Sequence, residues 1–268
     1  MIDFLETVIA ERRSDVARAR QRVPDEVMSA RARASGRQPQ LFWRSLLQDR
    51  EHIAVIAEVK RVSPAAGILR EQLDPVAQAR AYASAGARAI SVLTEPRHWG
   101  GSLDDLRAIR ASVDIPLLAK DVIVDRYQIY EARDAGADAI LLIAEAFDDT
   151  QLAGLVRVAH EVGLDPLVEA HDAEAFGRAV ACGAGIVGVN ARNLRRPAEL
   201  DIGRVRQLHT FVKRHHVLVA ESGMASVEDV RIMPSRVDAV LIGTALMRAD
   251  DPAPLIRAIA SIRRTVHA

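Results

Sequence analysis

The chain has very little cysteine, no excess of charge of either sign and no long apolar run. Its one cysteine, Cys182, excludes an intrachain disulfide framework and a cysteine-based zinc site, and is typical of a reducing compartment such as the cytoplasm. Lys plus Arg number 36 and Asp plus Glu also 36, so no basic excess favours nucleic acid or a membrane surface. No segment approaches the roughly 20 apolar residues of a membrane span. We therefore expect a cytoplasmic protein whose partner is a small molecule.

The N-terminal residues mix acidic with apolar side chains and lack a basic leader and a small-residue cleavage site, which argues against a signal peptide. Helical spacing of apolar residues predicts one helix from Ile2 to Arg20 and another from Leu41 to Gln48, joined by a polar connector over 31–40. Residues 1–50 are therefore expected to form an N-terminal helical extension. Its simplest role is to cover the rest of the domain, and a role as a lid over an active site stays open.

From residue 50 onward, short and nearly continuous apolar runs alternate with helical patterns. Runs that are apolar on both faces are typical of parallel strands covered by helices, and their alternation with helices indicates repeated βα units. The eight runs span residues 53–59, 89–93, 116–119, 139–143, 166–168, 186–189, 217–220 and 239–242.

An internal repeat supports this count, because Ala85–Ile90, Ala135–Ile140 and Cys182–Val187 each place a glycine between a predicted helix and the next strand. A left-handed helix cap needs glycine there. Eight parallel strands with short connections favour a closed barrel over an open doubly wound sheet, and no Gly-x-Gly-x-x-Gly follows the first strand. We predict an α/β fold, a (β/α)8 TIM barrel, as a single domain over 1–268 that includes the N-terminal helical extension.

Charged and polar side chains gather where the predicted strands end. In the run 53–64, an apolar strand ends in Glu58 and Lys60, which share one face and need partners if they are buried. The loops that follow the strands build the active site of this fold. A single such residue could belong to an ordinary charge pair, whereas a ring around one mouth indicates function. The ring comprises Glu58, Lys60, Glu95, Lys120, Glu169, Asn190, Arg192 and Glu221.

Lys120 and Glu169 are the candidate acid and base. Lys120 ends an apolar run, and a lysine in such a place can deliver its proton to a developing oxyanion. Glu169 follows Pro-Leu-Val and is the natural counterpart as general base. A simple salt bridge between the two residues is the alternative interpretation.

Two glycine-containing turns indicate a phosphate site. Glu221-Ser-Gly-Met follows the seventh predicted strand, and Ile242-Gly-Thr-Ala follows the eighth. Glycine permits close approach of the backbone, and the N–H groups at the start of a helix bind anions. Barrels often bind phosphate with these two loops. We predict phosphate binding there, with two tight turns as the alternative, by Ser222, Gly223, Gly243 and Thr244.

Arg192 and Trp99 suggest what else the substrate carries. The planar guanidinium of Arg192, two residues beyond Asn190, fits a carboxylate, although a surface arginine in a loop is the alternative. Trp99 lies in the loop after the second predicted strand, where it could contact an aromatic or sugar ring or pack against loop glycines. Together these residues predict a phosphorylated, carboxylated, ring-bearing substrate.

Taken in order, these motifs resemble the indole-3-glycerol phosphate synthases of tryptophan biosynthesis. The resemblance extends over nearly the whole chain, including the N-terminal helical extension characteristic of that family. It rests on Ala57–Pro64, Ala119–Asp121, Leu167–Glu169, Gly188–Leu194, Ala220–Gly223 and Leu241–Arg248.

The resemblance implies a carbon–carbon lyase that closes the ring of 1-(2-carboxyphenylamino)-1-deoxyribulose 5-phosphate, with loss of carbon dioxide and water and with no cofactor or metal. It makes Lys120 the general acid of ring closure and Glu169 the general base of the later dehydration. Glu58 and Lys60 would assist proton transfer. A monomer is implied, and weak association with other pathway enzymes stays open.

The same resemblance distributes the parts of the substrate over the cavity. The carboxylates of Glu58, Glu169 and Glu221 would stabilise the cation that forms before decarboxylation. The expected substrate contacts are Ser63 and Arg192 for the anthranilate carboxylate, Asn190 for a sugar hydroxyl or the catalytic groups, Trp99 with Leu142 for the ring, Ser222, Gly223, Gly243 and Thr244 for the phosphate, and Glu221 as a further contact.

Some positions depart from the family pattern and leave loop geometry and a secondary-pathway role open; they are Ala65, Ala66, Ala191, Asn193, Thr244 and the loop from Arg195 to Leu200. Two rival interpretations fit these residues less well. A barrel similar to phosphoribosylanthranilate isomerase would use a cysteine and an aspartate, yet Cys182 lies on a predicted helix. A barrel that only binds a sugar phosphate would not need an acid and a base.

Overall fold

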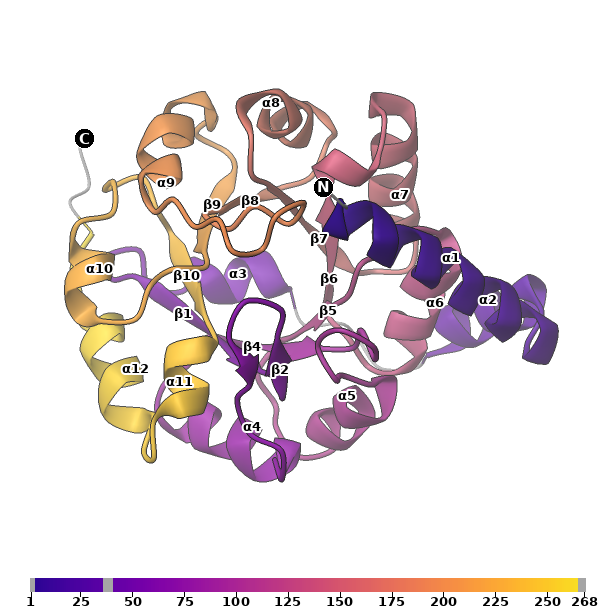
Figure 1. Cartoon of the computed structure of the whole chain (residues 1–268), viewed down its shortest axis with the longest axis horizontal. Coiled ribbons are helices and arrows are strands. Elements are labelled where there is room, and N and C mark those ends of the chain that lie inside the picture. The colour runs from indigo at the N-terminus through magenta and orange to yellow at the C-terminus, as the bar shows by residue number, and fades with distance from the viewer. Residues whose placement is uncertain (1–2, 36–40, 265–268) are drawn as a thin grey trace.

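The eight predicted strands form one closed parallel barrel in the computed structural model, which describes residues 3–35 and 41–264 (Figure 1). Strand β1 closes the ring because it pairs with both β4 and β10. The predicted (β/α)8 barrel is confirmed, with strand ends within two residues of those predicted. The strands are β1 (Ala54–Val59), β4 (Ala89–Leu93), β5 (Leu117–Lys120), β6 (Ala139–Ile143), β7 (Asp165–Ala170), β8 (Ile186–Asn190), β9 (Val217–Glu221) and β10 (Ala239–Ile242).

Helices surround the barrel, and several begin at a side chain that accepts a hydrogen bond from the first turn. These N-caps are Asp74, Ser102, Asp125, Asp148, Asp172 and Ser226. The outer helices are α4 (Pro75–Ser84), α5 (Leu103–Arg110), α6 (Arg126–Asp134), α7 (Asp149–Glu161), α8 (Ala173–Ala181), α9 (Gly203–Leu208), α10 (Val227–Arg231), α11 (Thr244–Arg248) and α12 (Ala253–Ala260), with the short 3-10 helices η1 (Ala144–Ala146) and η2 (His209–Phe211).

The repeated glycines have the backbone conformation that their position predicts. Gly86, Gly136 and Gly183 have φ angles of 98°, 94° and 92°, which residues with a Cβ atom rarely adopt. Each of them turns the chain from a helix into the next strand, so the repeat marks equivalent corners of the barrel. Within the described residues, no helix combines the length and the apolar character needed to cross a membrane.

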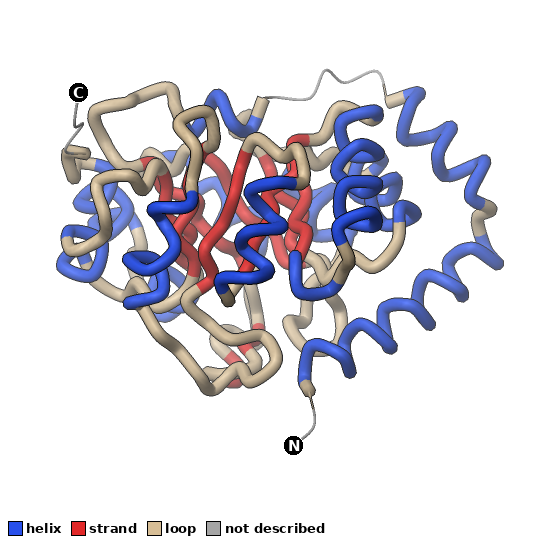
Figure 2. Tube along the Cα trace, turned by 90° about the horizontal axis from the view of Figure 1, so that it is seen from above, coloured by secondary structure: helices blue, strands red, loops and turns tan. Residues whose placement is uncertain are grey.

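The N-terminal extension contains three described helices rather than two: α1 (Phe4–Arg22), α2 (Asp25–Ala34) and α3 (Phe42–Leu46). The prediction of a connector over 31–40 is wrong for residues 31–34, which belong to α2, and residues 36–40 lie outside the described part. Figure 2 shows α1 starting on the side of the β2–β3 hairpin (Val62–Ser63 and Gly67–Ile68) and α3 lying at the opposite end of the barrel.

Helix α3 closes the end of the barrel where the strands begin. Its Phe42 and Leu46 are fully buried in the cluster that fills the barrel, and the Trp43 N–H donates to Asp165 at the start of β7 over 3.1 Å. The opposite end, where the strands finish, is left for the site. The extension therefore covers the barrel floor, as the simplest interpretation of residues 1–50 predicted.

Candidate active site

A cavity of about 700 Å³ opens where the strands end, a size typical of small-molecule sites. The structure brings most of the predicted site residues together around it. The predicted residues that line it are Glu58, Lys60, Ser63, Trp99, Lys120, Glu169, Asn190, Arg192, Ser222, Gly223, Gly243 and Thr244.

Lys120, at the end of β5, is held between carboxylates on the cavity floor. Its Nζ atom lies 3.0 Å from Oε2 of Glu221 and 3.4 Å from Oε1 of Glu58. Burial alone would lower the pKa of Lys120, but the charges of Glu221, Glu58 and Glu169 outweigh it and raise the pKa above its ordinary value. Lys120 is therefore a protonated ammonium, as a proton donor must be.

Glu58 and Lys60, the two charges that end β1, form an ion pair with 2.5 Å between Oε2 and Nζ. Burial by itself raises the pKa of Glu58. The charges of Lys60 and Lys120 outweigh that effect and lower the pKa below its ordinary value, so the carboxylate stays ionised. Gly243 makes this arrangement fit, because a Cβ atom there would stand 2.1 Å from Oε2 of Glu58 and 2.8 Å from Nζ of Lys60. The loop after β10 therefore packs directly against the Glu58–Lys60 ion pair.

Glu169, at the end of β7, has a raised pKa, in contrast to the lowered pKa of Glu58. Burial raises its pKa well above the ordinary value, and the neighbouring Glu221 raises it further, while Lys120 offsets only part of the effect. Asn190 orients the carboxylate by donating from Nδ2 to Oε1 over 3.2 Å. Among the described residues, neither Oε2 of Glu169 nor Oε1 of Glu221 receives a hydrogen bond. A proton shared by the two carboxyls would satisfy both.

Gly188, in β8, is a site residue that the sequence did not single out. A Cβ atom there would lie 2.2 Å from Oε1 of Glu221 and 3.2 Å from Cβ of Glu169. Only glycine therefore lets these two carboxyls sit side by side. The signal was present as a glycine inside an otherwise β-branched run, Ile186–Asn190, which often marks a close approach.

Two predicted substrate contacts lie elsewhere. Leu142 is fully buried between the barrel and its helices, because alternate residues of a strand face opposite sides and it is Leu141 and Ile143 that line the cavity. Glu221 is also fully buried and does not line the cavity. Its carboxylate instead contacts Nζ of Lys120 and lies beside Glu169.

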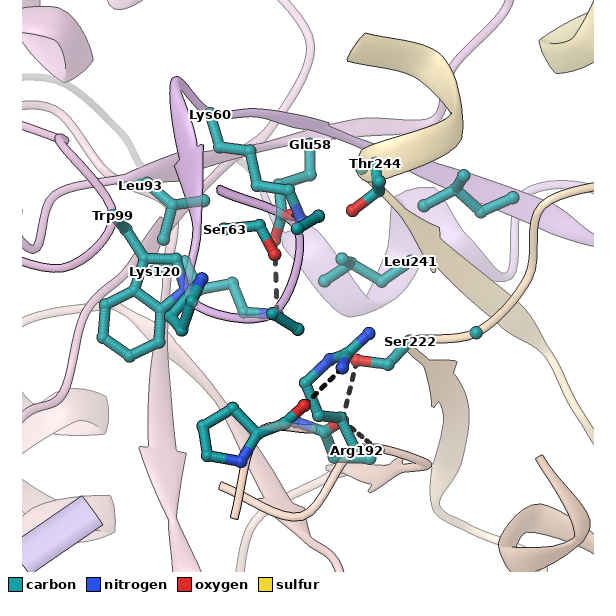
Figure 3. A pocket seen from close by; sticks show the side chains of 18 of the residues that line it. Glu58, Lys60, Ser63, Leu93, Trp99, Lys120, Arg192, Ser222, Leu241 and Thr244 are labelled. Atoms are coloured by element: carbon teal, nitrogen blue, oxygen red, sulfur yellow. Dashed lines mark hydrogen bonds and ion pairs between the residues drawn. The ribbon is translucent and has the colours of Figure 1, made fainter. Parts of the chain in front are cut away.

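The two ends of the cavity differ in character. Figure 3 shows Trp99 and Leu93 on one side and Thr244 on the other, with Glu58, Lys60 and Ser63 between them. Ser222 has a φ angle of 68°, unusual for a residue with a Cβ atom, and its Oγ donates to Oδ1 of Asn190 over 2.8 Å. One end is therefore suited to a ring, and the other offers backbone and hydroxyl groups to an anion.

The loop that carries Trp99 is fixed from both sides. Glu95 lies two residues beyond β4, at the start of this loop. Its carboxylate accepts hydrogen bonds from the backbone N–H groups of Arg97, His98 and Trp99 over 3.0, 2.6 and 3.1 Å. From α1, Phe4 packs against the Trp99 ring with 5.9 Å between centroids. Glu95 therefore shapes the loop, and α1 supports the aromatic end of the cavity.

Arg192, in the loop after β8, and Ser63, in the β2–β3 hairpin, both face the cavity (Figure 3). The backbone N–H of Arg192 donates to Oδ1 of Asn190 over 3.0 Å, and its Nη1 donates to the Pro197 carbonyl over 2.5 Å. Both residues can therefore meet a carboxylate in the cavity. Cys182, which a barrel of the isomerase type would need in its site, instead ends α8 with Sγ donating to the Ala179 carbonyl.

Fold and site together define a (β/α)8 barrel enzyme with a buried acid–base cluster at the mouth of its barrel. The chain matches the family model described as indole-3-glycerol phosphate synthase over residues 5–259, and it belongs to that family. The family comprises carboxy-lyases of tryptophan biosynthesis.

Curated relatives agree with this assignment. Indole-3-glycerol phosphate synthase of Carboxydothermus hydrogenoformans is 41% identical over 93% of this chain and 96% of its own. That of Roseiflexus sp. is 42% identical over 96% and 98%, and that of Nocardioides sp. is 51% identical over 78% and 80%. Among solved structures, 3-hexulose-6-phosphate synthase of Salmonella typhimurium is similar in fold, with a TM-score of 0.63 and 19% identity over 78% of this chain and 97% of that one.

Proposed function

We propose that this protein converts 1-(2-carboxyphenylamino)-1-deoxyribulose 5-phosphate to indole-3-glycerol phosphate, carbon dioxide and water, with Lys120 as general acid and Glu169 as general base. The observation that carries the proposal is the contrast between these two groups. Lys120 is kept protonated by surrounding carboxylates, and Glu169 has a raised pKa beside it. A pair of groups whose pKa values are pushed apart suits successive proton transfers.

Substrate binding follows from the two ends of the cavity. The phosphate goes to the turns with Ser222, Gly223, Gly243 and Thr244, where backbone N–H groups and hydroxyls suit an anion. The anthranilate ring lies against Trp99, with the apolar side chains of Leu93 and Leu141 near by. Its carboxylate is held by Ser63 and Arg192. The ketone then lies over Lys120.

In ring closure, the aromatic carbon that bears the carboxylate attacks the ketone, and Lys120 protonates the ketone oxygen. Decarboxylation returns an electron pair to the ring, whose transient cation is stabilised by the carboxylates of Glu58 and Glu169 with Glu221 beneath them. Glu169 then removes a proton from the neighbouring methylene carbon, while the hydroxyl accepts a second proton from Lys120, which has been reprotonated, and leaves as water. Lys60 balances the charge of Glu58, to which it is paired.

The test is turnover of the substrate by purified protein, followed by indole absorption and fluorescence with no metal or nucleotide added. Lys120→Met and Glu169→Gln are each expected to lower kcat by at least about 10²-fold, the usual contribution of a general acid or base. Lys213→Met is a matched control, because Lys213 is exposed and distant from the cavity lining. Full turnover by Lys120→Met would overturn the acid assignment, and binding without turnover by the wild type would favour a sugar-phosphate-binding protein.

We also propose that the protein works as a single-domain monomer in the cytoplasm. The continuity of α1 and α3 with the barrel supports the single domain. Light scattering of the purified chain tests the oligomeric state directly.

A further inference from the structure

A second cavity of about 290 Å³ lies behind the acid–base cluster and shares three wall residues with the first: Glu169, Asn190 and Leu194. The proposed general base therefore stands in the wall between two spaces. Two other residues of its lining, Arg195 and Arg196, are exposed, so the second cavity reaches the surface. Its volume has room for several water molecules at about 30 Å³ each.

His171, two residues beyond Glu169, stands in the wall of this second cavity. Its Nδ1 atom lies 3.1 Å from the carbonyl oxygen of Asn190. Because a carbonyl can only accept, Nδ1 carries the hydrogen and Nε2 of the neutral ring is an acceptor. No described residue contacts Nε2 by a hydrogen bond. The Nδ1 atom therefore fixes the imidazole ring, and the Nε2 atom is left to accept a hydrogen bond from water.

Groups around His171 can hold or pass protons. Glu145, from η1, accepts the backbone N–H of His171 over 2.5 Å, and burial raises the pKa of its carboxyl. Glu169 stands in the shared wall, and its Oε2 atom is buried and receives no hydrogen bond from the described residues. A continuous series then leads onward, because Glu221 lies beside Glu169 and 3.0 Å from Nζ of Lys120. The second cavity, Glu169, Glu221 and Lys120 therefore follow one another in the structure.

The proton balance of the proposed reaction requires such a connection. The ketone oxygen takes up two protons before it leaves as water, and the methylene carbon gives one proton to Glu169. The ionised carboxylate departs as carbon dioxide and leaves its electron pair in the ring, with no proton released. Each turnover therefore consumes one proton from solvent. A substrate in the first cavity displaces the water through which that proton would otherwise arrive.

On the basis of the proposed function, we propose that the second cavity is the proton-entry route of the reaction, with Nε2 of His171 passing protons from solvent to Glu169 through water. The proton lost by the methylene carbon and the proton from solvent together supply the two that the departing oxygen needs. Glu221 carries them onward to Lys120. In this scheme His171 does not touch the substrate and acts through Glu169.

The test is the single-turnover rate of indole formation with enzyme in excess. His171→Asn keeps a side-chain N–H for the Asn190 carbonyl but removes Nε2. We expect its rate to fall about tenfold with KM within twofold, since a relay contributes less than a direct acid or base. The solvent deuterium isotope effect should rise, because proton supply then limits the rate. His160→Asn is the matched control, because His160 is exposed at the end of α7.

Chemical rescue separates a relay from a structural role. His171→Ala leaves a gap for added imidazole, which should restore the rate in a concentration-dependent way and leave His160→Ala unchanged. If His171→Asn and His171→Ala turn over as fast as wild type, the route is wrong while the function stands. If both are slow and imidazole restores nothing, His171 only positions Asn190 and the proposal fails. If the wild type forms no indole, the function and this proposal fail together.

Discussion

At and below the cavity floor, three carboxyl groups meet two ammonium groups, so one negative charge is left over when all five groups are ionised. The carboxylates are Glu58, Glu169 and Glu221, and the ammonium groups are Lys60 and Lys120. The carboxylate without a lysine in direct contact is Glu169, because Glu58 pairs with Lys60 and Glu221 pairs with Lys120. A base whose proton affinity is raised by a neighbour's charge can take a proton from carbon more readily than an ordinary glutamate.

This arrangement predicts how acidity limits the rate. With Glu169 as the proposed general base, activity requires its ionised form, so the acid limb of kcat should lie at a higher pH than an ordinary glutamate would give. Removing the neighbouring charge in Glu221→Gln lowers the pKa of Glu169, and the limb should move to lower pH even though kcat itself falls. A pH–rate profile of both proteins measures this. Glu26→Gln, at an exposed position of α2, should leave the limb in place, and an unmoved limb in Glu221→Gln would refute the coupling.

Gly188 allows a second test at the same scale. In Gly188→Ala the new methyl group would meet Oε1 of Glu221 at 2.2 Å, so the carboxylate must move away from Glu169 and Lys120. We expect kcat to fall by about 10²-fold, as for misplaced catalytic groups. Gly154→Ala is the control, because a Cβ atom in that α7 position meets nothing within 4 Å. It should keep full activity and gain about 0.5–1 kcal/mol of stability. Equal activity of the two variants would show that the close approach is unimportant.

At the scale of elements, α1 is joined to the active-site end of β5 by a buried ion pair. Arg12 donates from Nε and Nη2 to the two carboxylate oxygens of Asp121, each over 2.9 Å, and Asp121 follows Lys120 directly. Thr94 donates to the same carboxylate over 3.0 Å. The extension therefore does more than cover the barrel, since one of its side chains fixes the residue next to the proposed acid.

Arg12→Leu should accordingly destabilise the protein strongly. The substitution leaves the carboxylate of Asp121 buried, with Thr94 as its one remaining side-chain donor among the described residues, and breaking one side of a buried pair costs roughly 3–5 kcal/mol. Urea unfolding followed by circular dichroism measures the loss. Arg13→Leu, one residue along on the exposed face of α1, should change stability by less than about 0.5 kcal/mol. The double variant Arg12→Leu with Asp121→Leu should recover part of the loss, and strict additivity would contradict the pairing.

Elements that follow from local patterns were predictable, and those set by tertiary packing were not. The eight strands and the glycine corners could be found because apolar runs and helix caps are local signals. Helix α2 is not predicted because its sequence, DEVMSARARA, has few large apolar residues, and the helix buries Met28 and Ala32 alone. The resemblance places Leu142 at the ring, whereas the structure turns it toward the helices; a strand buried on both sides gives no sign in its sequence of which residues point inward.

For the molecule as a whole, the location of the site could be predicted because the fold brings all strand ends to one mouth. Residues far apart in sequence, such as Lys120 and Glu221, meet for that reason alone. The second cavity could not be predicted, because it depends on how α1 and the loop after β8 pack over Glu169. This packing of the extension on the barrel supports the proposal that the two form a single domain and unfold together.

The two tryptophans test this unity, since they lie at opposite ends of the barrel. Trp43 is in α3, at the end where the strands begin, and Trp99 is in the loop that α1 supports. In the single-tryptophan variants Trp99→Phe and Trp43→Phe, fluorescence reports one end each, and circular dichroism at 222 nm reports the helices around the barrel. We expect the three unfolding midpoints in urea to coincide, as they do in a two-state transition. A Trp43 signal that changes at lower urea than the other two would mean that α3 undocks first, and that this helix is a separate unit on a barrel stable without it.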